Sequence, residues 1–484
     1  MKKLLHLSII TVLAGSVTLS LPVYADKKKT EEPAKEVAKE TKSESDLQGF
    51  SVTHTVGGKA QPTAKVDSDP LALLGALKQD LIAQLAKGKP LEMTTEIKPI
   101  FSSELAKTLK GLPPITVKTN VGADGQGVSD VSVPAYKYEG TKKGEKGVID
   151  WQGLTGQVKF PEDFSTMSQA FELAGATIDI EDTFKATLAK TTFSADLDAD
   201  LYPTKLNFNL PSLEGGDKDV QFVFNKILVD FTGGKGTSGL ELGKGSFSIA
   251  DVNVDNKAEE SQFKLNNLSV KFDTQEEKEV ANYTLNFSLD KFFASQEEID
   301  LSFLSNIELR KLDIAALLEI QKTASEMRKQ QMAGKMDESM MGMAMMGSLM
   351  QALPKLMAKS PEIAMTKLNL KTEEGQLDGG FSISLDGSKP LKMDDSAAML
   401  NALSGQADFV IDKGLIEQLM WMQMGSGEEM TEEQEKQMQT MIDQQIEDVV
   451  KQGLLVPTGE QFKLNATLKA GKLMVNGKEM PLPM

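Results

Sequence analysis

The segment SADLDADL, from Ser194 to Leu201, alternates one small or apolar residue with one polar residue. Successive side chains of a β-strand point to opposite faces, so the alternation predicts a strand whose apolar face carries Ala195, Leu197, Ala199 and Leu201. The opposite face would carry Asp196, Asp198 and Asp200. A calcium loop is the other interpretation of three aspartates, but the segment lacks the turn-forming glycine and the distal glutamate of such a loop. We expect a solvated strand face.

The same alternation recurs from about Leu91 to Leu312, in runs such as QFVFNKILVDF from Gln221 and YTLNFSLD from Tyr283. One apolar and one polar face per strand favour an antiparallel sheet, and clusters of Gly, Asn, Asp and Pro between the runs predict turns. Three short helices are predicted, at residues 70–87, 102–110 and 165–173. The glycine run at residues 233–246 predicts a flexible loop and no phosphate site, because Ser238 stands where Lys244 would require a glycine.

After Leu312 the pattern changes to helical zones followed by hairpins. A long helix or helical hairpin is predicted from Ile314 to Met357, with a break near Gly334 and an end marked by Pro354 and Pro361. A β-hairpin at residues 365–387 follows, then a second helical zone at 413–451 and a closing strand–turn–strand. The predicted fold is α+β: an extended, twisted antiparallel sheet of meander type, with helices packed on one face and C-terminal helix-plus-hairpin units.

The N-terminus has the pattern of a secretory signal peptide. Lys2 and Lys3 precede a largely apolar stretch at residues 4–21, and Val23 and Ala25 suit the −3 and −1 positions of a cleavage site. We predict cleavage after Ala25, with an uncleaved inner-membrane anchor as the alternative. The complete lack of cysteine suits a periplasmic protein without disulfides. The predicted organisation is signal peptide 1–25, disordered charged tether 26–48, mainly β region 49–312 and Met-rich helices with hairpins 313–484.

Composition disfavours several kinds of chemistry. The net charge of −17 repels phosphate backbones, so nucleic acid is not an expected partner. Only two histidines occur, and His6 lies in the signal peptide, which leaves His54 near the end of the tether. A lone histidine and no cysteine disfavour a histidine-dependent triad, a zinc site and thiol catalysis. We expect a non-enzymatic protein with no catalytic residues and no cofactor.

Methionine is concentrated in the final third of the chain: 22 of the 25 methionines lie from Met327 onward. Thioethers favour Cu(I), so a weak copper candidate is formed by Met336, Met340, Met343, Met346 and Met350. Methionine is also a good helix former and an adaptable apolar filler, which favours packing on the sheet, on a partner or on an apolar ligand. The candidates for such an apolar groove are Met340, Met343, Met346, Leu349, Met350, Leu353, Met420, Trp421 and Met424.

Three segments resemble the YdgA-like bacterial envelope proteins: VIDWQGLTGQVKF from Val148, PEIAMTKLNLKTEEGQLDGGFSISLDG from Pro361 and the ending LKAGKLMVNGKEMPL. The resemblance covers about residues 90–484. It implies a domain of unknown function in the envelope of Gram-negative bacteria, with an N-terminal membrane anchor in most members and no assigned catalytic residues. Members usually carry leucine where this chain carries its methionines, which favours the packing interpretation.

These observations predict an exported, periplasmic, non-enzymatic envelope protein that binds lipid or another hydrophobic partner in a groove between sheet and helices. The alternatives are a structural or protein-interaction scaffold without a ligand, and a copper-binding protein that uses its methionines. Other envelope proteins are candidate partners, and the sequence leaves membrane association open.

Overall fold

The computed structural model describes residues 47–481, except residues 86–88, 104–105, 107–110, 143–144, 182, 200–201, 297–298, 333–337, 389–395 and 425–430. The chain forms two compact units. Unit 1 comprises Met1–Glu181, Ala189–Leu206 and Met327–Asp337, and unit 2 comprises Asp182–Leu188, Asn207–Glu326 and Glu338–Met484. The predicted signal peptide and residues 26–46 of the predicted tether lie outside the described residues. The predicted boundary between residues 312 and 313 falls inside unit 2.

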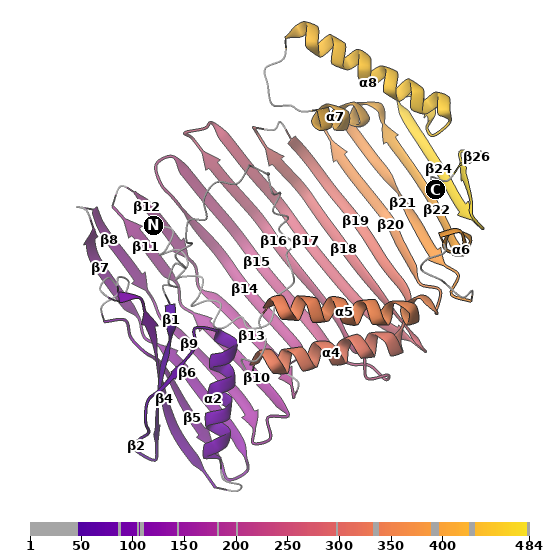
Figure 1. Cartoon of the computed structure of the whole chain (residues 1–484). Coiled ribbons are helices and arrows are strands. Elements are labelled where there is room, and N and C mark those ends of the chain that lie inside the picture. The colour runs from indigo at the N-terminus through magenta and orange to yellow at the C-terminus, as the bar shows by residue number, and fades with distance from the viewer. Residues whose placement is uncertain are drawn as a thin grey trace, which may run out of the picture. The chain divides into compact units, whose positions relative to one another are not determined.

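Unit 1 is built mainly from antiparallel strands (Figure 1). Its elements are β1 (Leu47–Val56), β2 (Lys59–Ala60), β3 (Ala64–Val66), α2 (Pro70–Gln84), β4 (Leu91–Phe101), β5 (Ile115–Val121), β6 (Gln126–Val133), β7 (Tyr136–Lys142), β8 (Glu145–Trp151), β9 (Leu154–Pro161), β10 (Thr166–Leu173), β11 (Ala176–Ile180) and β13 (Thr191–Asp198). The pairings run β3–β1–β4–β5–β6–β9–β10–β13, and a separate ladder joins β7, β8 and β11. β2 pairs with the end of β1.

Helix α2 closes the core of unit 1. Pro70 occupies its first turn, where the missing N–H costs no hydrogen bond. Leu73, Leu77 and Leu81 follow at a spacing of four residues, so they lie on one side of the helix. Leu73 packs with buried residues of β1 and β4, and Leu81 packs with buried residues of β4, β5 and β9. A single leucine-rich helix therefore covers a wide stretch of the sheet.

Unit 2 contains longer strands and most of the helices. Its elements and those leading into it are β12 (Phe184–Leu188), β14 (Pro203–Gly216), β15 (Val220–Lys235), β16 (Glu241–Asn256), β17 (Ser261–Glu277), β18 (Val280–Ala294), β19 (Ile299–Asp313), α4 (Ile314–Met332), α5 (Glu338–Met357), β20 (Glu362–Thr372), β21 (Gly375–Leu385), α6 (Ser396–Ala402), β22 (Leu403–Asp412), α7 (Lys413–Met424), α8 (Glu432–Gln452), β23 (Val456–Thr458), β24 (Gln461–Lys469), β25 (Lys472–Val475) and β26 (Lys478–Met480).

The strands of unit 2 pair in chain order from β15 to β22, which is the predicted meander. β24 continues the sheet beside β22, and β23 and β25 both pair with β24. The predicted antiparallel sheet is confirmed, because all the strand pairings that the structure describes are antiparallel. The hairpin predicted at 365–387 corresponds to β20 and β21.

Irregular residues keep the apolar side chains of the long strands on one face. In β15, apolar residues alternate up to Phe224 and restart one position out of phase at Ile227; in β17 they alternate up to Leu265 and restart at Leu268. Between them, Lys226 and Asn267 have left-handed backbone conformations, with φ of 51° each. The pairing register with the neighbouring strands is unchanged across both positions, so the left-handed residue re-aims the side chains that follow without inserting an extra residue. The change of phase in the sequence therefore compensates for this irregularity of the backbone.

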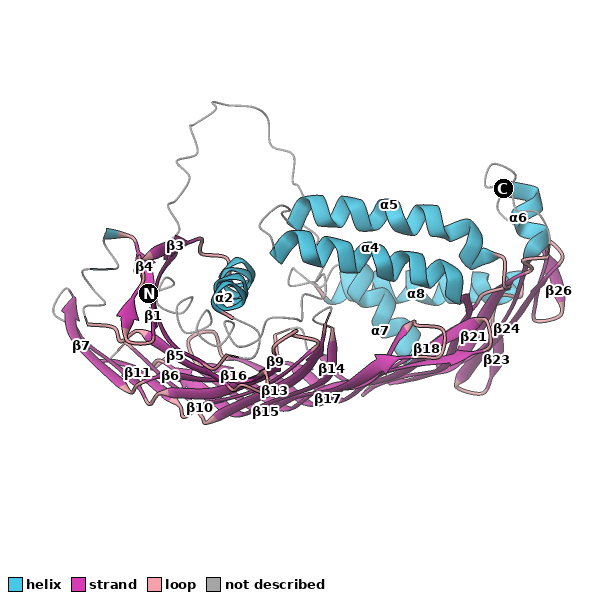
Figure 2. Ribbon diagram, turned by 90° about the horizontal axis from the view of Figure 1, so that it is seen from below, coloured by secondary structure: helices cyan, strands magenta, loops and turns pink. Residues whose placement is uncertain are grey.

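The helices of unit 2 lie on one side of its sheet (Figure 2). The predicted long helix is a helical hairpin: α4 packs against α5 through Ala316, Ala352 and Leu356. Residues 333–337, which include the predicted break at Gly334, lie outside the described residues. Pro354 does not end α5 as predicted, because it sits inside the last turns of the helix, which runs on to Met357. Pro361 does mark the boundary, since it directly precedes β20.

Two predictions of local structure are wrong. The helix predicted at 165–173 is strand β10, whose Met167 and Leu173 are buried in a sheet flanked by β9 and β13. Apolar residues at 167, 171 and 173 fit either period, and the strand neighbours decide between them. The loop predicted at 233–246 is also wrong, because most of this glycine-rich run belongs to the paired strands β15 and β16. Of the helix predicted at 102–110, most residues lie outside the described part.

Candidate functional site

The apolar face of the unit 2 sheet can be followed across its strands by register. Phe272 pairs with Leu285, Leu285 with Ile307, Ile307 with Met365 and Met365 with Phe381. Directly paired residues of an antiparallel sheet share a face. A parallel row on the same face pairs Tyr283 with Leu309, Leu309 with Ile363 and Ile363 with Ile383. The first apolar row therefore crosses five strands, β17 to β21, and the adjoining row crosses four, β18 to β21.

These rows lie on the side of the sheet that bears the helices. Tyr283 packs in a cluster with Leu317 and Leu318 of α4, and burial there raises the pKa of the Tyr283 phenol. The opposite face is polar: Asn369 donates to Asp378 at 2.7 Å, and Asn465 donates to Asp408 at 2.6 Å. The sheet is thus amphipathic across its width, and the helices belong to its apolar side.

The helices of unit 2 pack near the two ends of these strands and leave part of the apolar face uncovered. The chain leaves β19 into α4, returns from α5 into β20 and passes through α6 between β21 and β22, so these helices sit at one end of the strands. α7 and α8 follow the other end of β22, where Ile442 and Ile446 pack on Phe462 of β24. Beside α4–α6, within about five residues of these strand ends, large apolar side chains are exposed, from 37% for Leu309 to 51% for Ile363. We call this set the open band: Phe272, Leu285, Leu309, Ile363 and Ile383.

Helix α5 carries a second exposed apolar surface. Four of its large apolar residues are exposed, from 43% for Leu349 to 70% for Met343. We call this set the methionine stripe: Met343, Met346, Leu349 and Met350. Of the three predicted alternatives for these methionines, packing on the sheet is wrong, and packing on a partner or on an apolar ligand stays a prediction. The reason is that α5 docks through its other side, where Ala352 and Leu356 are buried and Ser348 donates to Thr323 at 3.3 Å. Small residues allow the close helix contact, and the methionines point away from it.

The other predicted groove residues have different surroundings. Leu353 is half-buried on α5. Met340 also belongs to α5, but its side chain is not described, and Met336 lies outside the described residues. Met420 and Trp421 of α7 are half-buried and pack in the cluster of Ile442, Ile446 and Phe462. Met424 ends α7, and its side chain is also outside the described set. The structure therefore brings Met420 and Trp421 into a helix–sheet core and leaves the methionine stripe in solvent.

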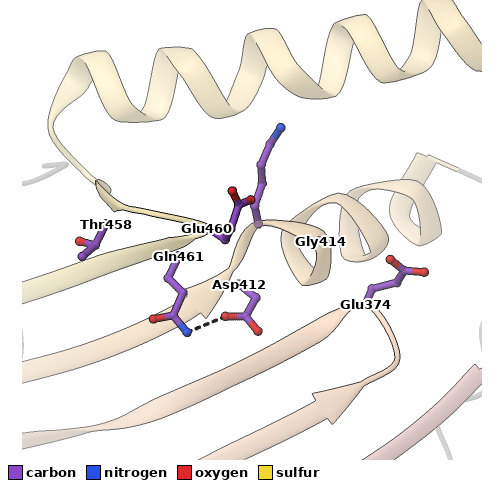
Figure 3. Close-up of a pocket in the computed structure, with 7 residues that line it drawn as sticks. Glu374, Asp412, Gly414, Thr458, Glu460 and Gln461 are labelled. Carbon is purple, nitrogen blue, oxygen red and sulfur yellow. Dashed lines mark hydrogen bonds between the residues drawn. The ribbon is translucent and has the colours of Figure 1, made fainter.

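A polar pocket of about 530 Å³ lies at the far end of the sheet, beside the start of α7 (Figure 3). Its lining residues are Glu374, Asp412, Lys413, Gly414, Thr458, Glu460 and Gln461. Asp412 accepts hydrogen bonds from the Gln461 side chain at 2.8 Å and from the Gln376 backbone at 2.9 Å. Hydrogen bonds to Glu417 and Asp443 raise the pKa of the Lys413 ammonium, which keeps it charged. The described lining carries no nucleophile next to a base, so the pocket offers no evident catalytic arrangement.

The sequence places His54 near the end of the tether; in the structure it lies near the end of strand β1 and is 9% exposed. Its Nδ1 is 2.8 Å from the Thr95 hydroxyl, and its Nε2 is 3.0 Å from a carboxylate oxygen of Asp80. An Asp–His–hydroxyl series resembles a nucleophile triad. However, Thr95 is only 2% exposed and has no access for a substrate. The three residues tie α2 to β1 and β4, a structural role that the sequence alone did not indicate.

In the described part of the chain, no group of three or more His, Cys, Asp or Glu side chains is arranged to hold a metal ion. The described helices also include none with the length and apolar character that a membrane crossing requires. The copper candidate rests on methionines and stays a prediction.

Comparison with known proteins identifies the family. A family model described as a bacterial protein of unknown function, DUF945, matches residues 74–483. No curated protein and no solved structure gives a match. The match covers nearly all of the described strands and helices, including the open band and the methionine stripe. The chain therefore belongs to this bacterial family of unknown function, DUF945.

Proposed function

We propose that the protein is an exported, non-enzymatic envelope protein of the YdgA-like kind, and that the open band of unit 2 binds the acyl chains of a lipid. The observation that supports this is the open band itself. Phe272, Leu285 and Ile363 lie on the apolar, helix-bearing face of the sheet, yet their side chains are 40%, 41% and 51% exposed. Contiguous exposed apolar surface of this kind marks interaction sites in soluble proteins.

The chemistry of the band suits an acyl chain. Leucine, isoleucine and phenylalanine offer dispersion contacts and no charge, so the gain comes from removing methylene groups from water, at about 0.8 kcal/mol for each buried CH₂. Two adjoining rows, one across five strands and one across four, provide an extended strip, whose shape suits a long, flexible chain. The net charge of −17 disfavours recruitment by anionic headgroups, so the apolar contacts must supply the affinity.

Lipid analysis of the purified protein tests the proposal. Native mass spectrometry and solvent extraction of the full chain should show bound lipid. A double variant of the open band, Leu285→Asn with Ile363→Asn, should lose most of it. The matched control changes neighbouring residues of the polar face on the same strands, Asn286→Ser with Lys371→Asn, and should keep it. Lipid-free wild-type protein, or equal lipid in both variants, would contradict lipid binding.

Two alternative functions have their own outcomes. A structural or interaction scaffold would carry no lipid, and cross-linking in intact cells would join it to other envelope proteins through the open band. Copper binding would appear as saturable uptake of Cu(I) that is lost when Met343, Met346 and Met350 are replaced by leucine. Export itself is tested by N-terminal sequencing of the mature protein, which should begin at Asp26.

A further inference from the structure

The methionines of the chain differ sharply in exposure. Met343, Met346 and Met350 are 70%, 53% and 58% exposed on one side of α5, whereas Met93 of β4 and Met167 of β10 are 6% and 9% exposed. The chain contains no cysteine, so it has no thiol to react first with an oxidant. Susceptibility of a sulfur side chain to oxidation follows its exposure. The three most exposed of the described methionines thus lie on one helix, and Met441 of α8 follows at 50%.

We propose that Met343, Met346 and Met350 form a reversible oxidation site, modified by peroxides to methionine sulfoxide. In the forward step, the thioether sulfur attacks one oxygen of hydrogen peroxide and the O–O bond breaks. The sulfur gains that oxygen and is oxidised by two electrons, and the peroxide is reduced to water. In the reverse step, a dithiol-dependent sulfoxide reductase removes the oxygen as water, and its dithiol becomes a disulfide.

The packing of α5 allows this modification without unfolding. The contacts that hold α5 come from its other side: Ala352 and Leu356 pack on α4 and β19. Lys355 pairs with Glu319 at 2.5 Å across the two helices. None of these contacts uses a sulfur of the stripe. A sulfoxide at the exposed positions therefore changes the surface of α5 and leaves its docking in place.

The consequence of oxidation is a change of surface chemistry. A sulfoxide is polar where the thioether is apolar, so three modifications on one helix face convert an adhesive apolar surface into a hydrated one. Leucine at these positions would give the same apolar surface without the response to oxidants. The site depends on the exposure of α5 and does not require the open band to bind lipid.

Peptide mapping of the full-length protein tests the site. Purified protein is treated with increasing hydrogen peroxide, digested and sequenced by mass spectrometry. Sulfoxide should form at the three stripe methionines at least about tenfold faster than at Met93 and Met167, which serve as buried controls in the same digest. A methionine sulfoxide reductase with dithiothreitol should then restore the thioethers. Equal rates at exposed and buried positions, or sulfoxides that the reductase cannot reduce, would overturn the proposal.

A second measurement separates surface modification from unfolding. Binding of a hydrophobic dye should fall at least about twofold on oxidation, because the stripe becomes polar, while the far-UV circular dichroism stays unchanged. The triple variant Met343→Leu, Met346→Leu, Met350→Leu keeps the apolar surface and should show no such fall. Dye binding that rises on oxidation, with loss of helical signal, would mean that oxidation unfolds α5 and would refute the site. An equal fall in the variant would also refute it.

Discussion

The two units use the same kind of amphipathic antiparallel sheet but cover it differently. In unit 1, α2 places Leu73 and Leu81 on the sheet, and strand residues beneath it such as Val52 and Ile97 are almost fully buried. In unit 2, the described helices leave part of a wider apolar face exposed. Among the described residues, all the large apolar side chains with high exposure lie in unit 2, except Ile82.

The difference shows which part of the apolar patterning serves folding. In unit 1, apolar side chains that alternate along the strands end in a closed core, so the pattern is explained by stability. In unit 2, the pattern continues across more strands than the helices cover, so folding alone does not explain it. The excess apolar surface of unit 2 is therefore the best candidate for an interaction site.

The largest expected effect comes from the core of unit 1. Ile97→Ala removes a side chain that is 3% exposed and should lower the free energy of unfolding of unit 1 by about 2–5 kcal/mol. The two tryptophans allow a separate readout, since Trp151 lies in unit 1 and Trp421 in unit 2. Urea unfolding of Ile97→Ala in a Trp421→Phe background reports unit 1 alone. A loss below about 1 kcal/mol would show that this core is not tightly closed.

The next effect concerns the contact between α2 and its sheet. His54→Ala removes the side chain that joins Thr95 to Asp80 and leaves the buried Thr95 hydroxyl without that partner. An unsatisfied buried hydroxyl costs about 1–3 kcal/mol. Hydrogen exchange should accelerate in α2 more than in β5, which serves as an internal reference. Unchanged exchange in α2 would mean that the leucines alone hold the helix.

Much of the architecture followed from local pattern, and the coverage of the sheet did not. Turn residues at Glu374 and Gly375 and alternation on either side predicted the β20–β21 hairpin, because strand period and turn chemistry are local properties. Strand β10 was mistaken for a helix because its apolar spacing fits both periods. His54 gave no signal, since its partners Asp80 and Thr95 come from other elements.

The candidate site was predicted only in part. The methionine-rich helix could be predicted from its composition. The side through which it packs is set by small residues such as Ala352, which form no recognisable sequence pattern. The open band could not be predicted either. The alternation around Leu285 indicates that one face of the strand is apolar, but it does not indicate whether a helix covers that face. Coverage depends on contacts between distant segments, which a single sequence does not report.

A smaller effect is expected from pH in unit 2. A hydrogen bond from Arg310 lowers the pKa of the Glu308 carboxyl below its ordinary value of 4.5. The folded carboxylate thus contributes stability that is fully present above pH 4.5 and is lost as the pH falls through the lowered pKa. The pair is partly exposed, so the contribution is at most about 1 kcal/mol. The free energy of unfolding of unit 2, measured through Trp421, should fall more between pH 7 and pH 3 in the wild type than in Glu308→Gln.

The smallest effect on stability is expected from a substitution in the open band. This substitution tests most directly the contrast between the closed core of unit 1 and the exposed apolar face of unit 2. Leu285→Ala removes a side chain that is already 41% exposed, so unit 2 should lose less than about 1 kcal/mol, measured through Trp421 in a Trp151→Phe background. Ala281→Ser on the same strand, at a fully buried position under α4, is the matched control and should cost more. If Leu285→Ala is as damaging as Ile97→Ala, the band is part of a closed core, and the contrast between the units fails. If it is mild in purified, delipidated protein and damaging in protein with its lipid retained, the bound chain is what completes the core of unit 2.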